Sequence, residues 1–379
     1  MAGPRRICVV GPGTRFLSGI TYYMYSLIGA LTEAGHECSA LLIRKLVPVR
    51  LYPGRSRVGN TLSDLSLPPG VRHLDGIDWY WGWSLVRAAM FLRRERPQVL
   101  VLQWWTGAVL HTYLVLAIVA RLLGAQVIVE FHEAQDAGEA RVPGAARYMN
   151  LIGGTLLRLS SAQLVHSSFD RDLIRHRYGL NGSVSLVPHA DYEYLARRPP
   201  LRAAPPGTIN LLYFGVIRPF KGVEDLIGAL DLLGTARSRF WVTVVGETWE
   251  GWDLPGRLIA ASPHRDRITL VNRYVSDAEA AGYFAGADVV VLPYHRSSSS
   301  GPLQIAMARG LPVVATKVGG LVEATARYGG AVLVEPGDPA SLAEGIHRAA
   351  PLAGHSFHGV STWADTVRDY SGLFDGMVR

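Results

Sequence analysis

Short apolar runs alternate with helix-like segments along most of the chain, and this alternation limits the possible folds more than any other feature. In the first half, the apolar runs cover residues 6–10, 36–43, 97–103, 125–133, 161–168 and 183–190. Segments with helical spacing lie between them at residues 20–35, 109–124 and 169–179. Strands alternating with helices predict a doubly wound α/β fold, and continuous apolar runs are typical of parallel strands buried on both faces.

A proline-rich segment interrupts this pattern, which then begins again. Residues 196–208, ARRPPLRAAPPGT, hold four prolines and no acidic residue, as expected of an interdomain linker. Apolar runs follow at residues 209–215, 241–247, 268–275, 288–294, 311–320 and 331–337. Because 379 residues are too many for one ordinary core, we predict two Rossmann-like domains facing across a cleft, an N-terminal domain at 1–195 and a C-terminal domain at 209–360.

Cysteine usage and hydrophobicity favour a cytoplasmic protein. Cys8 and Cys38 both fall in strand-like runs, which excludes a disulfide scaffold and favours a reducing compartment. The N-terminus has only a short apolar run and is not a signal peptide. The longest apolar segment, residues 108–120, is shorter than the roughly 20 residues of a membrane span. We therefore expect a cytoplasmic protein, with peripheral attachment to the inner membrane face left open.

A glycine loop, GPGTRFLSG at residues 11–19, follows the first predicted strand. It lacks the third glycine of a dinucleotide fingerprint, and the next strand ends in LLIRK where a ribose-binding acid is expected, which disfavours hydride transfer. A glycine loop that enters a helix still offers N–H groups to an anion or a sugar. Gly13 and Gly19 are therefore candidate ligand-binding residues, with a simple tight turn as the alternative.

Two cations follow the first strand of the second series. Arg218 and Lys221 lie between the run 209–215 and a helix predicted from Val223, with Gly222 easing the turn. In open α/β sheets, ligands bind outside the carboxyl ends of the strands. An arginine fork and a lysine point charge at such a position suit a diphosphate. The alternative is two solvated loop cations.

The serine run RSSSSGP, residues 296–302, follows the predicted strand 288–294 and precedes a helix. Serine and glycine before a helix supply capping hydroxyls, open N–H groups and the positive helix end, and Pro302 suits a first helical turn. We expect an anion cradle, facing Arg218 and Lys221 across neighbouring strands. Its residues are predicted to be Ser300, Gly301, Pro302, Leu303 and Gln304.

The ordered motifs resemble one known family. GHEC, FHE, LVPHAD, FGVIRPFKG, VVGE, VSDAEAAGYFAGADVVVLPY and AMARGLPVVATKVGGLVEA follow one another in the sequence. In this order they resemble the retaining GT-B glycosyltransferases of family 4, over a range from Arg6 to about Tyr370. The resemblance implies a hexosyltransferase with a sugar nucleotide, UDP- or GDP-linked, in the C-terminal domain. It also implies that a last helix, within residues 361–379, crosses back to the N-terminal domain.

The resemblance implies roles for single residues. Arg218 and Lys221 would bind the diphosphate and stabilise the leaving group, so that no metal is needed. His132, in FHE, would contact the transferred sugar, and retention would follow from front-side attack rather than from a covalent carboxylate intermediate. The same motifs imply donor-binding roles for further residues, namely Gly215, Glu247, Tyr274 and Glu323.

Two positions depart from the family pattern. Relatives carry two glutamates eight residues apart around this serine loop, and here those positions hold Ser297 and Ile305. An isoleucine offers no hydrogen bond to a ribose, so donor specificity is open at this site. One Asp-x-Asp occurs, at Asp170 and Asp172, where helix N-terminal acids explain it better than a metal site does.

The acceptor is expected in the N-terminal domain, which holds most of the clustered tryptophans. Trp104 and Trp105, with Glu133, are candidate acceptor-binding residues. Tryptophan suits both sugar stacking and a membrane interface. WYWGW (residues 79–83) and the five basic residues between Arg44 and Arg57 suggest an anionic membrane surface and a lipid-linked acceptor. A polysaccharide, a small hydrophobic acceptor, or core tryptophans beside a solvated loop are the alternatives.

Charge alone does not decide the partner. A net charge of +7 suits nucleic acid, membranes and phosphorylated substrates, but the motifs favour the last, and no nucleic-acid partner is expected. Two other classes compete with a transferase. They are a GT-B relative with other sugar-nucleotide chemistry, such as an epimerase, and a non-catalytic sugar-nucleotide-binding protein.

Overall fold

The computed structural model describes residues 3–16, 18–45, 63–78, 82–133, 143–180, 182, 184–190, 192, 198–202, 204–234, 239–249 and 251–377, with only the backbone of Phe16 and Lys45. Predictions that involve Trp79, Trp81 and the basic residues from Arg50 to Arg57 lie outside the described residues. The described residues up to His189, together with those from Thr362 on, form one compact unit (unit 1), and Ala190–Ser361 form the other (unit 2).

Unit 1 is built on a seven-stranded parallel sheet in the order β3-β2-β1-β4-β5-β6-β7. The strands are β1 (Arg6–Pro12), β2 (Glu37–Lys45), β3 (Arg72–Asp78), β4 (Val99–Trp104), β5 (Gln126–Phe131), β6 (Ala162–Val165) and β7 (Val184–Leu186). The central strands β4 and β5 are buried almost throughout, as continuous apolar runs require.

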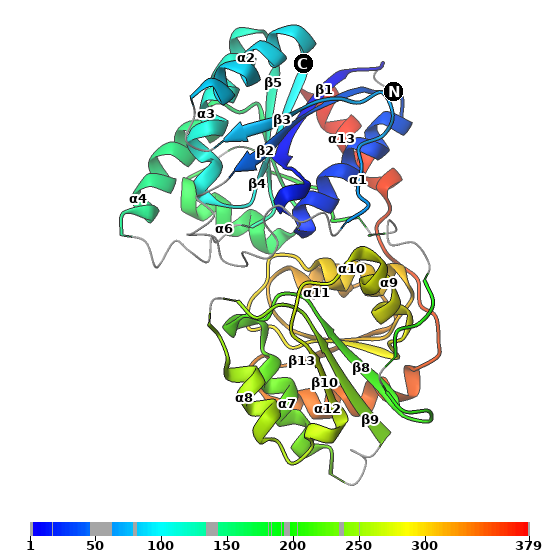
Figure 1. Cartoon of the computed structure of the whole chain (residues 1–379). Helices are drawn as coiled ribbons and strands as arrows, with labels where there is room; N and C mark the ends of the chain where they lie inside the picture. Colours follow the sequence, from blue (N-terminus) through cyan, green and yellow to red (C-terminus); the bar gives the residue numbers. More distant parts are fainter. Residues whose placement is uncertain are drawn as a thin grey trace. The chain divides into compact units, whose positions relative to one another are not determined.

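Helices cover both faces of this sheet (Figure 1). On one face, α1 (Gly19–Glu33) packs against β1 and β2 and against the C-terminal helix α13 (Trp363–Gly376). On the other face, α3 (Leu110–Leu122) packs between α2 (Trp83–Glu95) and α5 (Gly154–Leu159). The remaining described α-helices of unit 1 are α4 (Ala145–Tyr148) and α6 (Ser168–Tyr178).

Unit 2 has a six-stranded parallel sheet in the order β10-β9-β8-β11-β12-β13. Its strands are β8 (Ile209–Phe214), β9 (Phe240–Val245), β10 (Ile268–Val271), β11 (Val289–Leu292), β12 (Val313–Thr316) and β13 (Ala331–Val334). The two sheets confirm the prediction of two Rossmann-like, doubly wound domains.

The helices of unit 2 also lie on two sides of its sheet, with α7, α8 and α12 on one side and α9, α10 and α11 on the other (Figure 1). They are α7 (Val223–Leu232), α8 (Leu254–Ala261), α9 (Asp277–Ala285), α10 (Gly301–Ala308), α11 (Gly320–Thr325) and α12 (Pro339–Ala349). None of the helices in the described part of either unit is long and apolar enough to cross a membrane.

The described part of the proline-rich segment packs against unit 2. Leu201 N donates to the Gly282 carbonyl at 2.8 Å, and Arg202 forms an ion pair with Asp288 at 2.7 Å. A Cβ on Gly282 would lie 2.7 Å from the Leu201 side chain, so the glycine permits this close contact. These contacts fix the described part of the segment to unit 2.

Candidate active site

In unit 2, the strand order reverses between β8 and β11, and this switch point is where an open α/β sheet binds its ligand. The predicted residues lie in loops or first helical turns after consecutive strands. From β10 to β12 in sheet order, these residues are Tyr274, Glu247, the pair Arg218 and Lys221, Ser300, and Glu323. The sheet thus brings the predicted donor-binding residues to one edge, as the motifs implied.

Two glycines allow the loops at this edge to approach closely. Gly222 has φ +62°, and a Cβ there would lie 1.9 Å from the Pro293 carbonyl oxygen, so the loop after β8 contacts the end of β11 through bare backbone. Gly246 is similar, because its Cβ would lie 1.8 Å from the Gly215 carbonyl oxygen. Only glycine fits at these two positions, because each has a positive φ and a carbonyl oxygen less than 2 Å from where a Cβ would lie. The backbone itself therefore fixes where Arg218 and Lys221 lie.

Aromatic rings hold the two predicted cations. The Arg218 guanidinium carbon lies 3.5 Å from the centroid of the Trp249 ring, and Lys221 Nζ lies 3.6 Å from the centroid of Tyr294. Trp249 is brought there by a parallel bridge between Ile217 and Thr248, in which Ile217 N donates to the Glu247 carbonyl at 3.0 Å and Trp249 N donates to the Ile217 carbonyl at 2.9 Å. Cation–π contacts restrict both charges without neutralising them. Both side chains are half-buried at this edge of the sheet.

The serine loop does start a helix, but it offers fewer open N–H groups than the sequence predicted. Ser300 caps α10, with its hydroxyl accepting from Leu303 N at 3.3 Å, and its carbonyl accepts from Gln304 N at 3.1 Å. This corrects the expectation that the N–H groups of Leu303 and Gln304 form an anion cradle. Pro302 has no N–H, so Gly301 remains as the donor at the first turn.

The positions that lack the family glutamates have structural uses. Ile305 is buried, and therefore packs in the core of unit 2. Ser297 shapes the loop, donating to the Ser299 carbonyl at 2.7 Å and accepting from Gly320 N at 3.3 Å through its own carbonyl. Glu323, in the first turn of α11, is exposed. Its carboxylate is therefore accessible to a ligand at this edge, whereas neither replaced position supplies an acid.

In unit 1, the strand order reverses between β1 and β4, and the glycine loop follows β1. Gly13 is buried at the end of this strand, where its N–H donates to the Ile43 carbonyl at 3.3 Å. Gly19 is exposed and is the first residue of α1. The loop therefore reaches the sheet edge with Gly19 at a helix N-terminus, and Gly13 extends the β1–β2 pairing beyond the end of β1.

His132 directly follows β5 at the same edge and belongs to a buried hydrogen-bonded network. Its Nε2 contacts Gln103 Oε1, and Gln103 Nε2 donates to Glu130 Oε2 at 2.5 Å. Glu130 also accepts from the hydroxyls of Tyr23 and Tyr370, each at 2.6 Å. The network joins α1, β4, β5 and α13. Sequence reasoning identified only His132 in it.

Two more histidines surround this network. His166 follows β6 and packs its ring 4.8 Å from that of His132, and His189 lies 5.2 Å from His166. The Tyr23 ring packs against all three histidine rings, with centroid distances of 4.8 Å to His132, 5.1 Å to His166 and 4.7 Å to His189. Burial lowers the pKa of His132 well below its ordinary value and that of His166 to about 4. Both rings are therefore neutral near pH 7.

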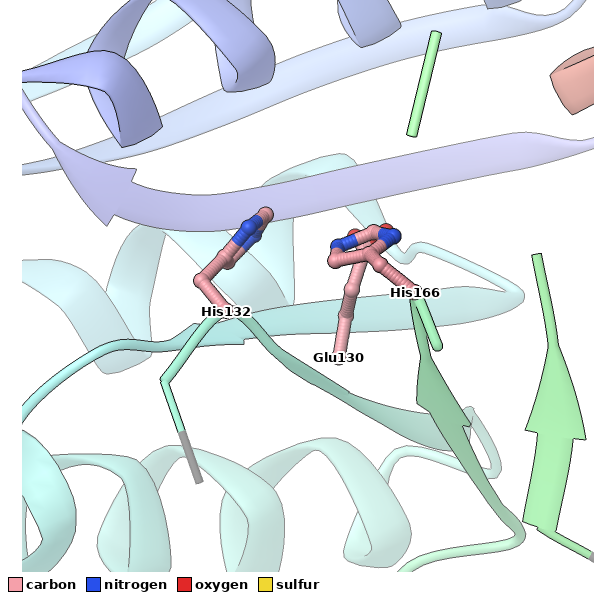
Figure 2. Close-up of side chains that lie close together, drawn as sticks. All are labelled: Glu130, His132 and His166. Carbon is pink, nitrogen blue, oxygen red and sulfur yellow. The ribbon is translucent and has the colours of Figure 1, made fainter. Parts of the chain in front are cut away.

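Glu130, His132 and His166 are the residues in the described part of the chain that could share a metal ion, since one ligand-type atom from each lies within 4.8 Å of the others (Figure 2). The donor set fits an ion poorly. The Glu130 carboxylate already accepts three hydrogen bonds, and His132 Nε2 is engaged by Gln103. Asp170 and Asp172 do not form a site either, because Asp170 is buried against Ser167 and Asp172 is exposed.

The predicted acceptor residues differ in their surroundings. Trp104 is only 2% exposed and stacks on Phe131 at 4.7 Å, so its assignment to acceptor binding was wrong. It ends β4, a central strand buried on both faces, and therefore belongs to the core. Trp105 is partly buried against the same core. Glu133 is half-buried immediately after His132.

The sequence did contain a signal for the residues that were missed. Gln103 and Glu130 are polar residues inside otherwise apolar runs, and the sheet register places them opposite each other on β4 and β5. A buried polar residue in a parallel strand needs a partner, and the two neighbouring runs supply one for each other. Trp249 and Tyr294 gave no such signal, because aromatic residues at strand ends are common core residues.

Comparisons with known proteins agree with the fold. A family described as "Glycosyl transferase 4-like domain" matches residues 18–190, and one described as "Glycosyl transferases group 1" matches residues 208–350. Together they match most of the chain. They meet near the boundary between the two units.

Curated relatives carry glycosyltransferase and synthase names. The D-inositol 3-phosphate glycosyltransferase of Pseudarthrobacter chlorophenolicus is 29% identical over 83% of this chain and 77% of its own length. That of an Arthrobacter species is 32% identical over 48% of this chain, and the match spans 47% of that relative. The glycogen synthase of Mycobacterium tuberculosis is 27% identical over 87% of this chain and 82% of its own length.

Solved structures share the fold at low identity. Sucrose-phosphate synthase from Thermosynechococcus elongatus has a TM-score of 0.66 and 19% identity, covering 98% of this chain and 96% of its own. Anabaena HepE, solved in complex with UDP-glucose, has a TM-score of 0.65 and 13% identity, covering 98% of this chain and 100% of its own.

Proposed function

This chain belongs to the group 1 glycosyl transferases and has their GT-B fold, and from that premise we propose that it transfers a hexose from a nucleotide diphosphate sugar to an acceptor hydroxyl with retention. The observation that carries the proposal is the position of Arg218 and Lys221 at the switch point of the unit 2 sheet. Each cation is restricted by an aromatic ring and is only half-buried.

The proposed chemistry uses the two cations on the leaving group. As the bond from the sugar to the diphosphate breaks, negative charge grows on the diphosphate oxygens, and a pre-positioned guanidinium and ammonium stabilise that charge. The acceptor hydroxyl attacks from the face that the diphosphate leaves, and passes its proton to a departing phosphate oxygen. We propose that this needs no metal, because two fixed cations supply the charge that a divalent ion would.

We propose a UDP-sugar as the first donor to test, with a GDP-sugar second. The support is that HepE, with the same fold, is solved with UDP-glucose. Ile305 and Ser297 replace the acids expected near the ribose and the sugar, so the exposed Glu323 is our candidate for donor hydroxyl recognition. The curated relatives are named for inositol 3-phosphate and for glycogen, so both a small polyol and a polysaccharide are acceptors to test.

Release of UDP from UDP-glucose by the purified full chain tests the proposal. Arg218→Ala and Lys221→Ala should each lower kcat/KM by about a hundredfold or more, the usual loss when one stabilising group is removed. Arg296→Ala, a neighbouring cation over Phe220, is the matched control and should retain most activity. If the wild type binds UDP-glucose without releasing UDP, the result favours a non-catalytic sugar-nucleotide-binding protein.

Treatment with EDTA tests whether the reaction needs a metal. Activity that is unchanged after EDTA treatment supports the metal-independent mechanism, and a loss of activity that a divalent ion restores contradicts it.

We further propose that α2 attaches unit 1 to an anionic membrane. Trp83, Val86 and Met90 recur at helical spacing and are 79%, 45% and 57% exposed, forming an apolar stripe. Arg87, Arg93 and Arg94 are also exposed on this helix. Apolar residues flanked by arginines are typical of helices that lie in the interface of an anionic bilayer.

Flotation with anionic vesicles tests this surface. The wild type should float, and Trp83→Asp with Met90→Asp should remain at the bottom. Leu232→Asp, which changes an equally exposed apolar residue of unit 2, should float like the wild type. A wild type that remains at the bottom would contradict membrane attachment and would favour a soluble acceptor.

A further inference from the structure

We propose that Gln103, Glu130 and Tyr370 are positioning residues that hold the His132 ring with its hydrogen on Nε2 and leave the Nδ1 lone pair to a ligand. This rests on the function proposed above only in assigning that ligand, a hydroxyl of the transferred sugar. The remaining steps depend on hydrogen bonds within unit 1.

The orientation of the Gln103 amide determines which nitrogen of His132 carries the hydrogen. Gln103 Nε2 faces Glu130 Oε2 at 2.5 Å, and a carboxylate can only accept, so the amide nitrogen belongs on that side. The Gln103 oxygen therefore faces His132 Nε2, and since an amide oxygen also only accepts, that nitrogen must donate. Nδ1 is then the ring nitrogen with the lone pair.

Glu130 keeps the Gln103 amide in this orientation. Its side chain is fully buried and meets three donors: the hydroxyls of Tyr23 and Tyr370 and the Gln103 amide. Burial raises the pKa of Glu130, and these hydrogen bonds oppose the shift. If Glu130 carried a proton, its O–H would need an acceptor. The nearest candidates are the Nε2 lone pair of His166, 3.7 Å from Glu130 Oε1, and a turned Gln103 oxygen, which would place the Gln103 N–H₂ against His132 and reverse the tautomer. An ionised Glu130 can only accept, and so excludes the turned orientation of Gln103.

Tyr370 connects the C-terminal helix to this arrangement. It lies 240 residues from Glu130 in the sequence, and its hydroxyl donates to the same Oε2 atom as Gln103 does. Helix α13 packs on α1, which supplies Tyr23 to the other carboxylate oxygen. Two helices on one face of the sheet thus fix the Glu130 carboxylate. This carboxylate orients the Gln103 amide, and the amide in turn sets the tautomer of His132.

The tautomer determines what the histidine can recognise. A neutral ring with a lone pair on Nδ1 accepts a hydrogen bond from a hydroxyl and cannot donate one to a phosphate oxygen. His132 in this state selects an O–H group, while the phosphate-binding cations belong to the other unit. The neighbouring His166 has the opposite tautomer, because its Nδ1 lies 2.9 Å from the Val187 carbonyl, which can only accept. His166 is therefore an internal reference for His132.

Nitrogen NMR of the full chain, labelled with ¹⁵N-histidine at pH 7.5 without ligand, tests the proposal. Each signal is assigned by its loss in His132→Asn or His166→Asn. We expect His132 as the Nε2–H tautomer and His166 as the Nδ1–H tautomer. In Glu130→Met, the Gln103 N–H₂ loses its acceptor and either orientation of the amide is allowed, so His132 should become a mixture of tautomers while His166 stays as it is. A wild-type His132 that is protonated, mixed or Nδ1–H overturns the proposal, and so does a single Nε2–H tautomer in Glu130→Met.

Further variants keep the test decisive if Glu130→Met does not fold. Gln103→Met keeps the side-chain length and removes both hydrogen bonds, so His132 should become a mixture of tautomers. Tyr328→Phe removes a buried hydroxyl of unit 2 that donates to the Leu311 carbonyl, and should leave both histidines unchanged. A single Nε2–H tautomer in Gln103→Met contradicts the proposal.

Kinetics then separate the positioning role from the proposed reaction. If UDP-glucose is turned over, Gln103→Met should lower kcat about tenfold, the equivalent of one hydrogen bond, and leave KM within about twofold. An unchanged kcat would contradict the assignment of a sugar hydroxyl to Nδ1. If the wild type turns over no sugar nucleotide, the proposed function fails, while the NMR result still decides the tautomer.

Discussion

The carboxyl edges of the two sheets have the same topology and opposite electrostatics. In unit 1 the edge holds neutral histidines and one carboxylate in a buried hydrogen-bonded network. In unit 2 the edge holds two half-buried cations against aromatic rings, above loops joined by glycine contacts. Because a switch point recurs in both sheets, the difference arises from the side chains and not from the fold. This difference is the basis for our proposal that one edge binds a hydroxyl and the other a diphosphate.

The contrast also concerns how each edge is held in place. Side-chain hydrogen bonds position His132, and each depends on a donor and an acceptor being present in the correct tautomer. Backbone contacts position Arg218 and Lys221, and these depend on the absence of a Cβ at Gly222 and Gly246. We therefore expect the unit 1 edge to respond to pH and to isosteric polar changes. The unit 2 edge should respond to added volume.

Gly222→Ala should have the largest effect. The added Cβ would lie 1.9 Å from the Pro293 oxygen at φ +62°, so the loop that carries Lys221 must move away from β11. Overpacking and the unfavourable φ together should lower the free energy of unfolding by about 3 kcal/mol, and transferase activity should fall at least a hundredfold. Urea unfolding and initial rates measure the two effects.

Gly337→Ala is the matched control for this change. Gly337 has φ +68°, but a Cβ there would meet nothing within 4 Å. It should cost only the conformational part, about 1 kcal/mol, with activity retained. If the two variants were equally stable and active, the glycine contact would not position the unit 2 edge.

The predictability of each edge follows from the same contrast. Strand ends and loop cations are local features, so Arg218, Lys221 and the serine loop could be placed on neighbouring strands from the sequence. The Glu130 network depends on sheet register and on a contact with Tyr370, 240 residues away, which no local pattern contains. Trp104 was misplaced for a related reason. Its assignment to acceptor binding rested on the suitability of tryptophan for sugar stacking, whereas stacking on Phe131 in the next strand buries it.

Low pH should destabilise the unit 1 edge because His166 is held neutral there. Burial lowers the pKa of His166 from its ordinary 6.5 to about 4, so below pH 6.5 the unfolded state binds a proton that the folded state does not. The contribution of His166 to stability is therefore fully present above pH 6.5 and is lost as pH falls toward 4. At pH 5 the loss is about 2 kcal/mol.

His166→Gln isolates this contribution, because Glu130 and His132 titrate in both proteins. The free energy of unfolding of the variant, relative to the wild type, should rise by about 2 kcal/mol between pH 7.5 and pH 5. Denaturant titrations at the two pH values provide the difference. A pH-independent difference would mean that His166 is not held neutral in the folded protein.

Trp249→Leu should have the smallest effect and tests whether the aromatic platform matters at the cationic edge. The leucine keeps an apolar side chain after β9 but removes the ring 3.5 Å from the Arg218 guanidinium, a contact worth about 1 kcal/mol. Arg218 should then sample more conformations, and KM for the sugar nucleotide should rise about fivefold. Trp249→Phe restores a ring face and should recover most of that loss. Equal KM values in all three proteins would mean that the backbone contacts at Gly222 and Gly246 suffice to position the guanidinium, which would make the unit 2 edge independent of its aromatic residues.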